Sequence, residues 1–301
     1  MKKIIATIAF VLVSMASSAQ LLYRVSGGQL AKPSYVVGTF HLASASFADK
    51  IVGIREALDA TDQVYGEVKW DDMLNADSLK FLQRQMMLPD GKSLKSVMSA
   101  ASYAKLNAYL KASMGVGLEN AIVEQQMGHL LPASLTSQLE MMQYMTGHMG
   151  EFDPTNTIDS YFQTQAKTNN EPIGGLETIR FQSSMLFGST PLKRQLALLD
   201  CFLNNQDYYA SLSERMAKAY FAQDIDALQK VVDEKFSATC DATPEELDLL
   251  IYKRNADWAK KMPAIMAAKP TLFVVGAAHL SGERGLLELL RKAGFKVEAV
   301  K

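Results

Sequence analysis

Two seven-residue windows, one near each end of the chain, share five letters: VVGTFHL at residues 36–42 and VVGAAHL at residues 274–280. Each window closes a short run of β-branched and apolar residues, which is typical of a buried strand. The glycine three residues before each histidine has no Cβ, so another group can approach the backbone there closely. We therefore expect His41 and His279 to lie at the ends of two strands, as neighbouring walls of one site.

Two further stretches have the same build but end in glutamate. QVYGEV places Glu67 after a glycine in a strand-like run, and PIGGLET places Glu177 after two glycines. Because ligands of open α/β sheets bind at the carboxyl ends of the strands, we expect the four side chains to gather there. Imidazoles and carboxylates together suit zinc, manganese or cobalt. His41, His279, Glu67 and Glu177 are therefore the candidate metal ligands, with Glu177 at the rim or behind the others.

A divalent ion at such a site would support hydrolysis. An open coordination position on zinc lowers the pKa of bound water to ~7, which makes a nucleophile at neutral pH. A carboxylate that does not bind the metal, Glu67 or Glu177, is the candidate base. Arg254, on a late predicted helix, is the candidate for stabilising an oxyanion or binding a substrate carboxylate. Asn255 and Gln182 are secondary candidates.

Each of these residues also has a structural interpretation that stays open. A histidine at a strand end often only makes a hydrogen bond, and Glu177 is also favourable as negative charge near a helix start. Arg254 is equally compatible with a structural ion pair. The two remaining histidines, His129 and His148, fit no HExxH pattern and are interpreted as surface or packing residues.

The first residues indicate export. Lys2 and Lys3 precede an apolar run at residues 4–15, and small residues at 16–19 are typical of a signal-peptidase site. We expect residues 1–19 to be a signal peptide, cleaved between Ala19 and Gln20. The apolar run is too short for an ordinary transmembrane helix, and the cleavage region has no cysteine to be lipidated. The mature protein is therefore expected to be periplasmic or secreted, without a stable membrane anchor.

Composition excludes several classes of protein. The formal net charge is −1, which gives no general basic field for nucleic acid or anionic membranes. With two cysteines the chain is neither a disulfide-rich scaffold nor a CxxC zinc protein. An exported chain permits a disulfide between Cys201 and Cys240, but two buried thiols are an equal alternative.

The pattern of elements predicts an α/β fold. LLYRVSG and SYVVGTFH, joined through GQLAKP, predict an antiparallel hairpin. A helix at about residues 47–60 then crosses over to QVYGEV, which predicts a parallel unit with His41 and Glu67 side by side. A second strand, helix and strand follow residue 270. We expect one domain over residues 20–301, with a central mixed sheet built from these βαβ-type units and a helical insertion at about 73–152.

The predicted insertion is rich in methionine. Ten of the sixteen methionines fall between Met73 and Met149, and methionine is flexible enough to fill irregular gaps or to line an adaptable apolar surface. Core filling is the simpler interpretation. A groove that holds an extended substrate over the site is the alternative.

Several of these motifs together resemble the TraB/GumN family, which is related to the Tiki proteins. They are the paired GxxH windows, the glutamate after the first, the GLET segment, the RN pair on a late helix, and the ending VVGAAHLSGERGLLELLRKAGFKV. The resemblance covers nearly the whole mature chain and implies an α/β fold with a helical insertion. For the Tiki branch it implies metal-dependent proteolysis, and for wider relatives, such as erythromycin esterases and ChaN, it implies other hydrolysis or haem binding.

Position by position, the family's histidines fall on His41 and His279, its first acidic residue on Glu67, its GLE glutamate on Glu177 and its helix arginine on Arg254. The chain departs from many relatives at YFAQD, residues 220–224, where they have glycine directly before the aspartate. It also differs from animal Tiki proteins, which are membrane anchored, and this weakens any transfer of their substrate.

Three classes of function stay open at this point. The first is a metal-dependent hydrolase of the cell envelope, acting on a peptide or protein. The second is an envelope protein that binds haem or a metal through the same histidines. The third is a non-catalytic accessory of the envelope or of polysaccharide export. The sequence specifies neither the metal nor an oligomeric state.

Overall fold

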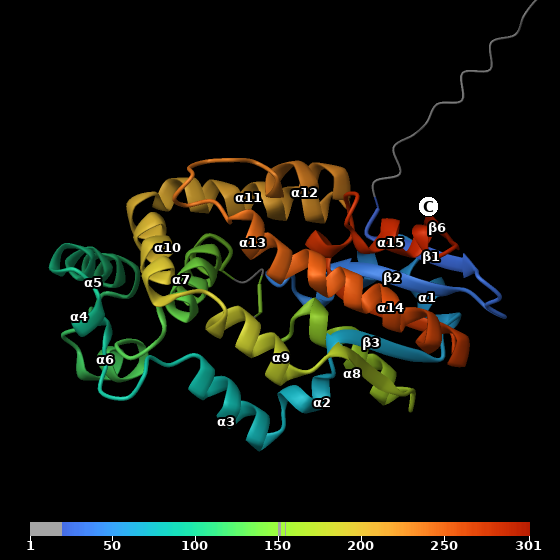
Figure 1. Ribbon diagram of the computed structural model, residues 1–301, viewed down its shortest axis with the longest axis horizontal. Helices are drawn as coiled ribbons and strands as arrows, with labels where there is room; N and C mark the ends of the chain where they lie inside the picture. The colour runs from blue at the N-terminus through green and yellow to red at the C-terminus, as the bar shows by residue number, and fades with distance from the viewer. Residues whose placement is uncertain (1–19, 150–151, 154) are drawn as a thin grey trace, which may run out of the picture.

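A computed structural model describes residues 20–149, 152–153 and 155–301 (Figure 1). The predicted signal peptide, residues 1–19, lies outside the described residues. The chain has two parts: a sheet with helices packed around it and, beside it, a lobe made of helices (Figure 1). Within the described ranges, no helix is long and apolar enough to cross a bilayer.

Six strands form a single mixed sheet, in the order β4-β3-β5-β2-β1-β6. The strands are β1 (Leu22–Gly27), β2 (Ser34–Thr39), β3 (Gln63–Val68), β4 (Ile173–Glu177), β5 (Thr271–Gly276) and β6 (Phe295–Ala299). Strand β1 runs antiparallel to its neighbours β2 and β6, whereas β2, β5, β3 and β4 are mutually parallel. The α/β class, the mixed sheet and the hairpin of β1 and β2 are confirmed.

One predicted pairing is wrong. Strands β2 and β3 follow each other through a helical crossover, but they are not neighbours, because β5 lies between them and pairs with both. Five of the six residues of β5 are buried. Such a continuous apolar strand suits a central position with both faces covered. The two histidine windows are thus direct neighbours, and His41 and Glu67 follow strands on either side of β5.

Two hydrophobic cores correspond to the two parts of the chain. The first lies around the sheet and includes Trp258, Phe162 and Tyr220 from the surrounding helices. The elements around it are η1 (Ala45–Lys50), α1 (Ile54–Asp59), α8 (Ile158–Thr168), α11 (Gln206–Phe221), α12 (Ile225–Val232), α14 (Lys253–Ala268), η4 (Ala277–His279) and α15 (Leu286–Lys292).

The second core fills the helical lobe and includes Leu106, Leu139 and Phe202. The lobe contains α4 (Leu94–Val97), α5 (Ala100–Met114), α6 (Ala121–Met127), α7 (Pro132–Gly147) and α10 (Leu192–Asn204), and α3 (Ala76–Gln85), which has no residue in this core, leads to it from the sheet. Six methionines of the predicted insertion pack against this core: Met86, Met87, Met98, Met114, Met127 and Met142. Core filling is therefore their main role, as the simpler interpretation had it.

Shorter helices connect the two parts near the carboxyl ends of the strands. They are α2 (Trp70–Met73), α9 (Ile179–Ser183), η2 (Ser184–Gly188), α13 (Pro244–Leu247) and η3 (Asp248–Tyr252). The π-helical turn η3 lies between α13 and α14 and ends two residues before Arg254, and the π-helical turn η2 begins two residues after Gln182. Such turns occur often at functional sites, because the extra residue re-aims the side chains that follow.

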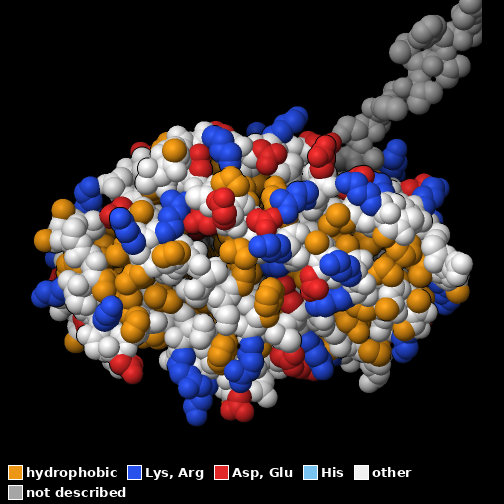
Figure 2. Space-filling view, in the orientation of Figure 1, with side chains coloured by type: hydrophobic (Ala, Val, Ile, Leu, Met, Phe, Trp, Pro, Cys, Tyr) orange, Lys and Arg blue, Asp and Glu red, His pale blue; other side chains and the backbone are white. Residues whose placement is uncertain are grey.

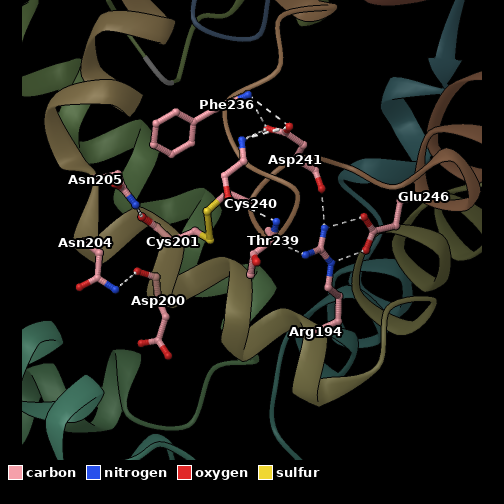
Figure 3. The surroundings of a disulfide bond; sticks show 11 residues. Arg194, Asp200, Cys201, Asn204, Asn205, Phe236, Thr239, Cys240, Asp241 and Glu246 are labelled. Atoms are coloured by element: carbon pink, nitrogen blue, oxygen red, sulfur yellow. Dashed lines mark hydrogen bonds and ion pairs between the residues drawn. A yellow bond between two sulfur atoms is a disulfide. The ribbon is translucent and has the colours of Figure 1, made fainter.

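A disulfide joins α10 to the segment before α13 (Figure 3). It links Cys201 and Cys240, whose Cα atoms lie 5.6 Å apart, so the alternative of two thiols is excluded. Arg194 holds the same segment: it donates to Glu246 with two bonds of 2.9 Å, and also to the carbonyls of Thr239 and Asp241 (Figure 3). A capping box formed by Thr243 and Glu246 then starts α13.

Candidate active site

A pocket of about 230 Å³ opens at the carboxyl ends of the parallel strands. Its lining residues include His41, Glu67, Trp70, Met73, Asp159 and Gln182. His279 and Arg254 lie buried next to Glu67. The strand ends thus bring together the residues that the repeated windows and QVYGEV singled out, because three of the four parallel strands end here.

The glycines of the two windows allow the walls to approach. A Cβ on Gly38 would lie 2.7 Å from Leu280 Cδ1 and 3.1 Å from Ala277 Cβ, both in the second window. At Gly276 the main-chain N–H donates to Glu67 Oε1 at 2.8 Å, and a Cβ there would lie 3.3 Å from the same oxygen. The close contact of β2, β5 and the Glu67 carboxylate therefore depends on glycine at these two positions.

Arg254 is the centre of the buried charges. Its guanidinium donates to Glu177 with two bonds of 3.1 and 2.8 Å, and its Nη2 also donates to Glu67 Oε2 at 2.5 Å. Trp258 Nε1 donates to Glu177 Oε2 at 3.3 Å, so both oxygens of Glu177 are engaged. The Arg254 side chain is only 6% exposed, and two carboxylates neutralise it in a place where an unpaired charge would be costly.

These contacts set the charge of the two glutamates. Burial works to raise the pKa of Glu67, but the Arg254 guanidinium and the hydrogen bond from the Gly276 N–H lower it. Gln182 supports the ionised form by donating to Glu67 Oε2 at 3.0 Å. Burial raises the pKa of Glu177, although Arg254 opposes this rise. Glu67 is thus an ionised carboxylate at the pocket, fixed by hydrogen bonds, and Glu177 is the buried ion-pair partner of Arg254.

The hydrogen bonds of His279 fix its tautomer. Arg254 Nη1 lies 3.1 Å from Nε2, and because a guanidinium only donates, Nε2 must carry the lone pair. Nδ1 then donates to Asn255 Oδ1 at 2.7 Å, while Asn255 Nδ2 donates to the carbonyls of His279 and Arg284. Burial lowers the pKa of His279 to about 4, so this imidazole is neutral at physiological pH.

His41 is held by a carboxylate that the sequence did not single out. Its Nδ1 lies 3.0 Å from Asp159 Oδ2, and Thr39 donates to the other oxygen of Asp159 at 2.5 Å. The charge of Asp159 and the hydrogen bond between Asp159 and His41 raise the pKa of His41 to about 9. The His41 side chain is 76% exposed, and its Nε2 is left for the pocket. Asp159 lies 118 positions from His41 in α8, without the strand and glycine pattern of the other site residues.

The other two histidines lie in the helical lobe. His129 Nδ1 lies 3.0 Å from the Lys92 carbonyl, and the His148 ring stacks on Tyr144 with centroids 4.0 Å apart. Neither lines the pocket that contains His41. Their interpretation as surface or packing residues agrees with these contacts.

The donors fit a divalent ion in type, but the arrangement is not a closed site. Each site histidine has Nδ1 fixed by an oxygen, which is how proteins orient an imidazole toward a metal. However, no group of three or more His, Cys, Asp or Glu side chains in the described residues is arranged to hold a metal ion. The reason is visible at Arg254, which takes the Nε2 lone pair of His279 and both oxygens of Glu177.

Comparison with known families decides the relationship. The model of the TraB/PrgY/gumN family matches residues 21–299, from β1 to the end of β6. The chain belongs to this family. The matched range spans both histidine windows, Glu67, Glu177 and Arg254.

Relatives of known name are distant. The chain is 23% identical to Metalloprotease TIKI2 of Danio rerio, over 95% of this chain and 62% of the relative. It is 25% identical to Metalloprotease TIKI1 of Homo sapiens, over 88% of this chain and 59% of the relative. The Metalloprotease TIKI homolog of Nematostella vectensis is 20% identical, over 89% and 65%. The chain thus spans about three fifths of the length of these proteins.

Proposed function

We propose that this protein is a metal-dependent hydrolase of the cell envelope that cleaves peptide bonds. The observation that carries the proposal is the pair of oriented histidines, His41 on Asp159 and His279 on Asn255, which follow neighbouring strands beside the ionised Glu67. His41 and His279 would hold the ion, His279 through Nε2 after Arg254 Nη1 has moved off it, with Glu67 beside them, and manganese, cobalt or zinc suits these donors. The bound ion would supply an activated water.

The remaining site residues have roles of their own. Glu177 was a candidate ligand and base, but because Arg254 engages both of its oxygens, we assign it to holding Arg254 in place. All five N–H groups of Arg254 are engaged, by Glu177, Glu67, His279 and the Leu250 carbonyl, so its charge acts on the site through Glu67. Glu67 lies at the pocket and is the candidate for receiving a proton, and Asp159 holds the His41 ring.

Export to the periplasm or the medium is part of this proposal. The sequence of residues 1–19 predicts it, and the disulfide of Cys201 and Cys240 supports it, because such bonds persist in oxidising compartments. A peptide or protein is the proposed substrate, since the relatives are named as proteases.

Metal analysis of the purified mature chain, starting at Gln20, tests the site. We expect about one divalent ion per chain, lost in His41→Ala and in His279→Ala while the fold persists. His129→Ala and His148→Ala are matched controls, since they remove the chain's other two imidazoles, and they should keep the ion. Glu177→Gln should also keep it, whereas a ligand role would predict its loss. Retention of the ion at the wild-type level in both site variants would refute this metal site.

Hydrolysis is tested with a peptide library, added manganese, cobalt or zinc, and mass spectrometry of the products. Glu67→Gln keeps the shape but loses the charge, so cleavage should fall by ~100-fold or more. Arg254→Lys keeps the charge but loses the fork and should also impair turnover. If wild type cleaves nothing with any ion, yet binds haem with a spectrum that His41→Ala abolishes, a binding function replaces the hydrolase.

A further inference from the structure

Strand β4 is an open edge of the sheet beside the site. It pairs with β3 on one side, and no described strand pairs with its other side. Val64 N–H of β3 donates to the Pro172 carbonyl, and this bond fixes which residues of β4 turn their main-chain groups toward β3. Because the main-chain groups of a strand alternate in direction, those of Gly175 and Glu177 face away from β3. They form a row of donors and acceptors that another extended chain can pair with.

The opposite edge of the sheet is built differently. Strand β6 carries exposed Lys296 and Glu298, which form an ion pair of 2.8 Å. Charged side chains of this kind are a common means of blocking unwanted strand pairing. Strand β4 has no exposed charge: Glu177 is buried against Arg254, and the middle of the strand consists of two glycines. The strand itself therefore carries none of this protection, and the charge nearest its main chain is Lys261 of α14, which donates to the Leu176 carbonyl at 2.7 Å.

A cleft of about 440 Å³ lies at the carboxyl-terminal half of β4. Residues from Gly175 to Thr178 form its floor, and Lys69 and Asp72 line one side and Asp257 and Lys261 the other. These sides belong to the start of α2 and to α14, which lie on either side of the end of β3 (Figure 1). Acidic and basic side chains lie next to each other below α14 in Figure 2.

The cleft and the site pocket share a wall. Lys69 and Asp72 line the cleft, whereas Trp70 and Met73, on the same short helical segment, line the pocket with His41. The wall formed by α9 is divided in the same way, with Phe181 on the cleft and Gln182 on the pocket. A chain that lies along β4 toward its carboxyl end therefore arrives at the residues that enclose the site.

We propose that this cleft binds the polypeptide substrate in extended form, as a seventh strand added to β4. This inference rests on the proposed function and assigns where its substrate docks. Main-chain hydrogen bonds to Gly175 and Glu177 would give affinity independent of sequence, and alternate side chains would enter the cleft. The Phe181 side chain, 53% exposed at the cleft, would contact an apolar substrate residue. Lys69 and Asp257 would favour charged residues of either sign.

Binding is measured without metal, so the result does not depend on catalysis. The probes are fluorescein-labelled eight-residue peptides, selected from a random library for binding to the wild-type chain in the presence of a chelator. Each peptide is made in two further forms, with N-methyl groups on its odd or on its even residues. In strand addition only alternate N–H groups face β4, so one form should bind roughly tenfold or more weakly and the other nearly normally.

A pair of phenylalanine variants tests the cleft itself. Phe181→Ala should weaken binding of the unmodified peptides several-fold, whereas Phe221→Ala, which truncates another exposed phenylalanine on α11, should not. Equal effects of the two N-methyl forms, an unchanged affinity in Phe181→Ala, or no bound peptide at all would overturn the proposal. If wild type cleaves peptides but the two N-methyl forms bind equally, the hydrolase function stands and β4 is rejected as the docking strand. If one N-methyl form binds more weakly but no peptide is cleaved, β4 stands as a peptide-binding strand and the hydrolase function is rejected.

Discussion

At the scale of single residues, the site depends on partners that fix otherwise ordinary side chains. His41 and His279 have opposite environments: the Asp159 charge raises the pKa of the first to about 9, and burial lowers that of the second to about 4. One imidazole is therefore charged and the other neutral near pH 7 in the metal-free chain. A metal ion that binds His41 must displace its proton, so affinity for the metal should rise with pH toward 9.

Asp159→Asn tests the partner of His41. The amide keeps the shape but removes the charge, so the pKa of His41 should fall from about 9 toward its ordinary 6.5. His41 has a raised pKa in the folded chain, so it contributes stability below about pH 6.5 that is lost as the pH rises through 9. The variant should lose this pH dependence. Above about pH 9, where His41 is neutral in both chains, its affinity for the metal should fall roughly 10–100-fold. An NMR titration of the His41 ring protons measures the pKa, and an unchanged value would contradict the role of Asp159.

Glu140 gives a second prediction at this scale, away from the site. Burial on α7 raises the pKa of its carboxyl to about 7. A raised carboxyl pKa means that the folded chain is more stable with Glu140 protonated, and this stability is lost between about pH 4 and pH 7. Glu140→Gln should therefore raise the free energy of unfolding by about 2 kcal/mol at pH 8 and leave it unchanged at pH 4. Urea unfolding at both pH values measures this, with exposed Glu56→Gln as control.

At the scale of elements, the sequence predicts which strands carry the site better than it predicts their order. The strand and glycine pattern placed His41, Glu67, Glu177 and His279 at strand ends, because that pattern is local. The insertion of β5 between β2 and β3 is a long-range pairing, which no local pattern encodes. The role of Asp159 was missed because its contact with His41 is also long-range. In the sequence, an aspartate in the first turn of α8 looks like an ordinary helix start, where negative charge is favourable.

Gly38→Ala tests the contact between the two histidine windows. The added Cβ would lie 2.7 Å from Leu280 Cδ1, so β2 and the η4 turn must separate. We expect a loss of about 1–3 kcal/mol of stability and weaker metal binding, because η4 carries His279. Gly147→Ala is the control: it lies in α7, its Cβ would meet nothing closer than 3.8 Å, and it should be neutral or slightly stabilising. Equal stability of the two variants would show that the close approach is unimportant.

At the scale of the whole molecule, the disulfide connects the helical lobe to the helices that position Arg254. Cys201 lies next to Phe202 of the second core, and Cys240 precedes the capping box from which α13, η3 and α14 follow. The bond closes a loop with a sequence separation of 39. A loop of that length restricts the unfolded chain by about 4 kcal/mol. The spacing of two cysteines in the sequence left this bond undecided, because pairing depends on where α10 packs.

Removing this bond in Cys201→Ala/Cys240→Ala should lower the free energy of unfolding by about 4 kcal/mol and the melting temperature by on the order of 10 °C. The chain should still fold, because Arg194 holds the same segment through Glu246 and two carbonyls. Calorimetry with and without a reductant measures the effect. The reductant should lower the melting temperature of wild type to that of the double variant and leave the variant unchanged. A wild-type melting temperature that stays constant while two thiols become titratable would mean that packing around Arg194, and not the disulfide, holds the lobe to the α14 helix.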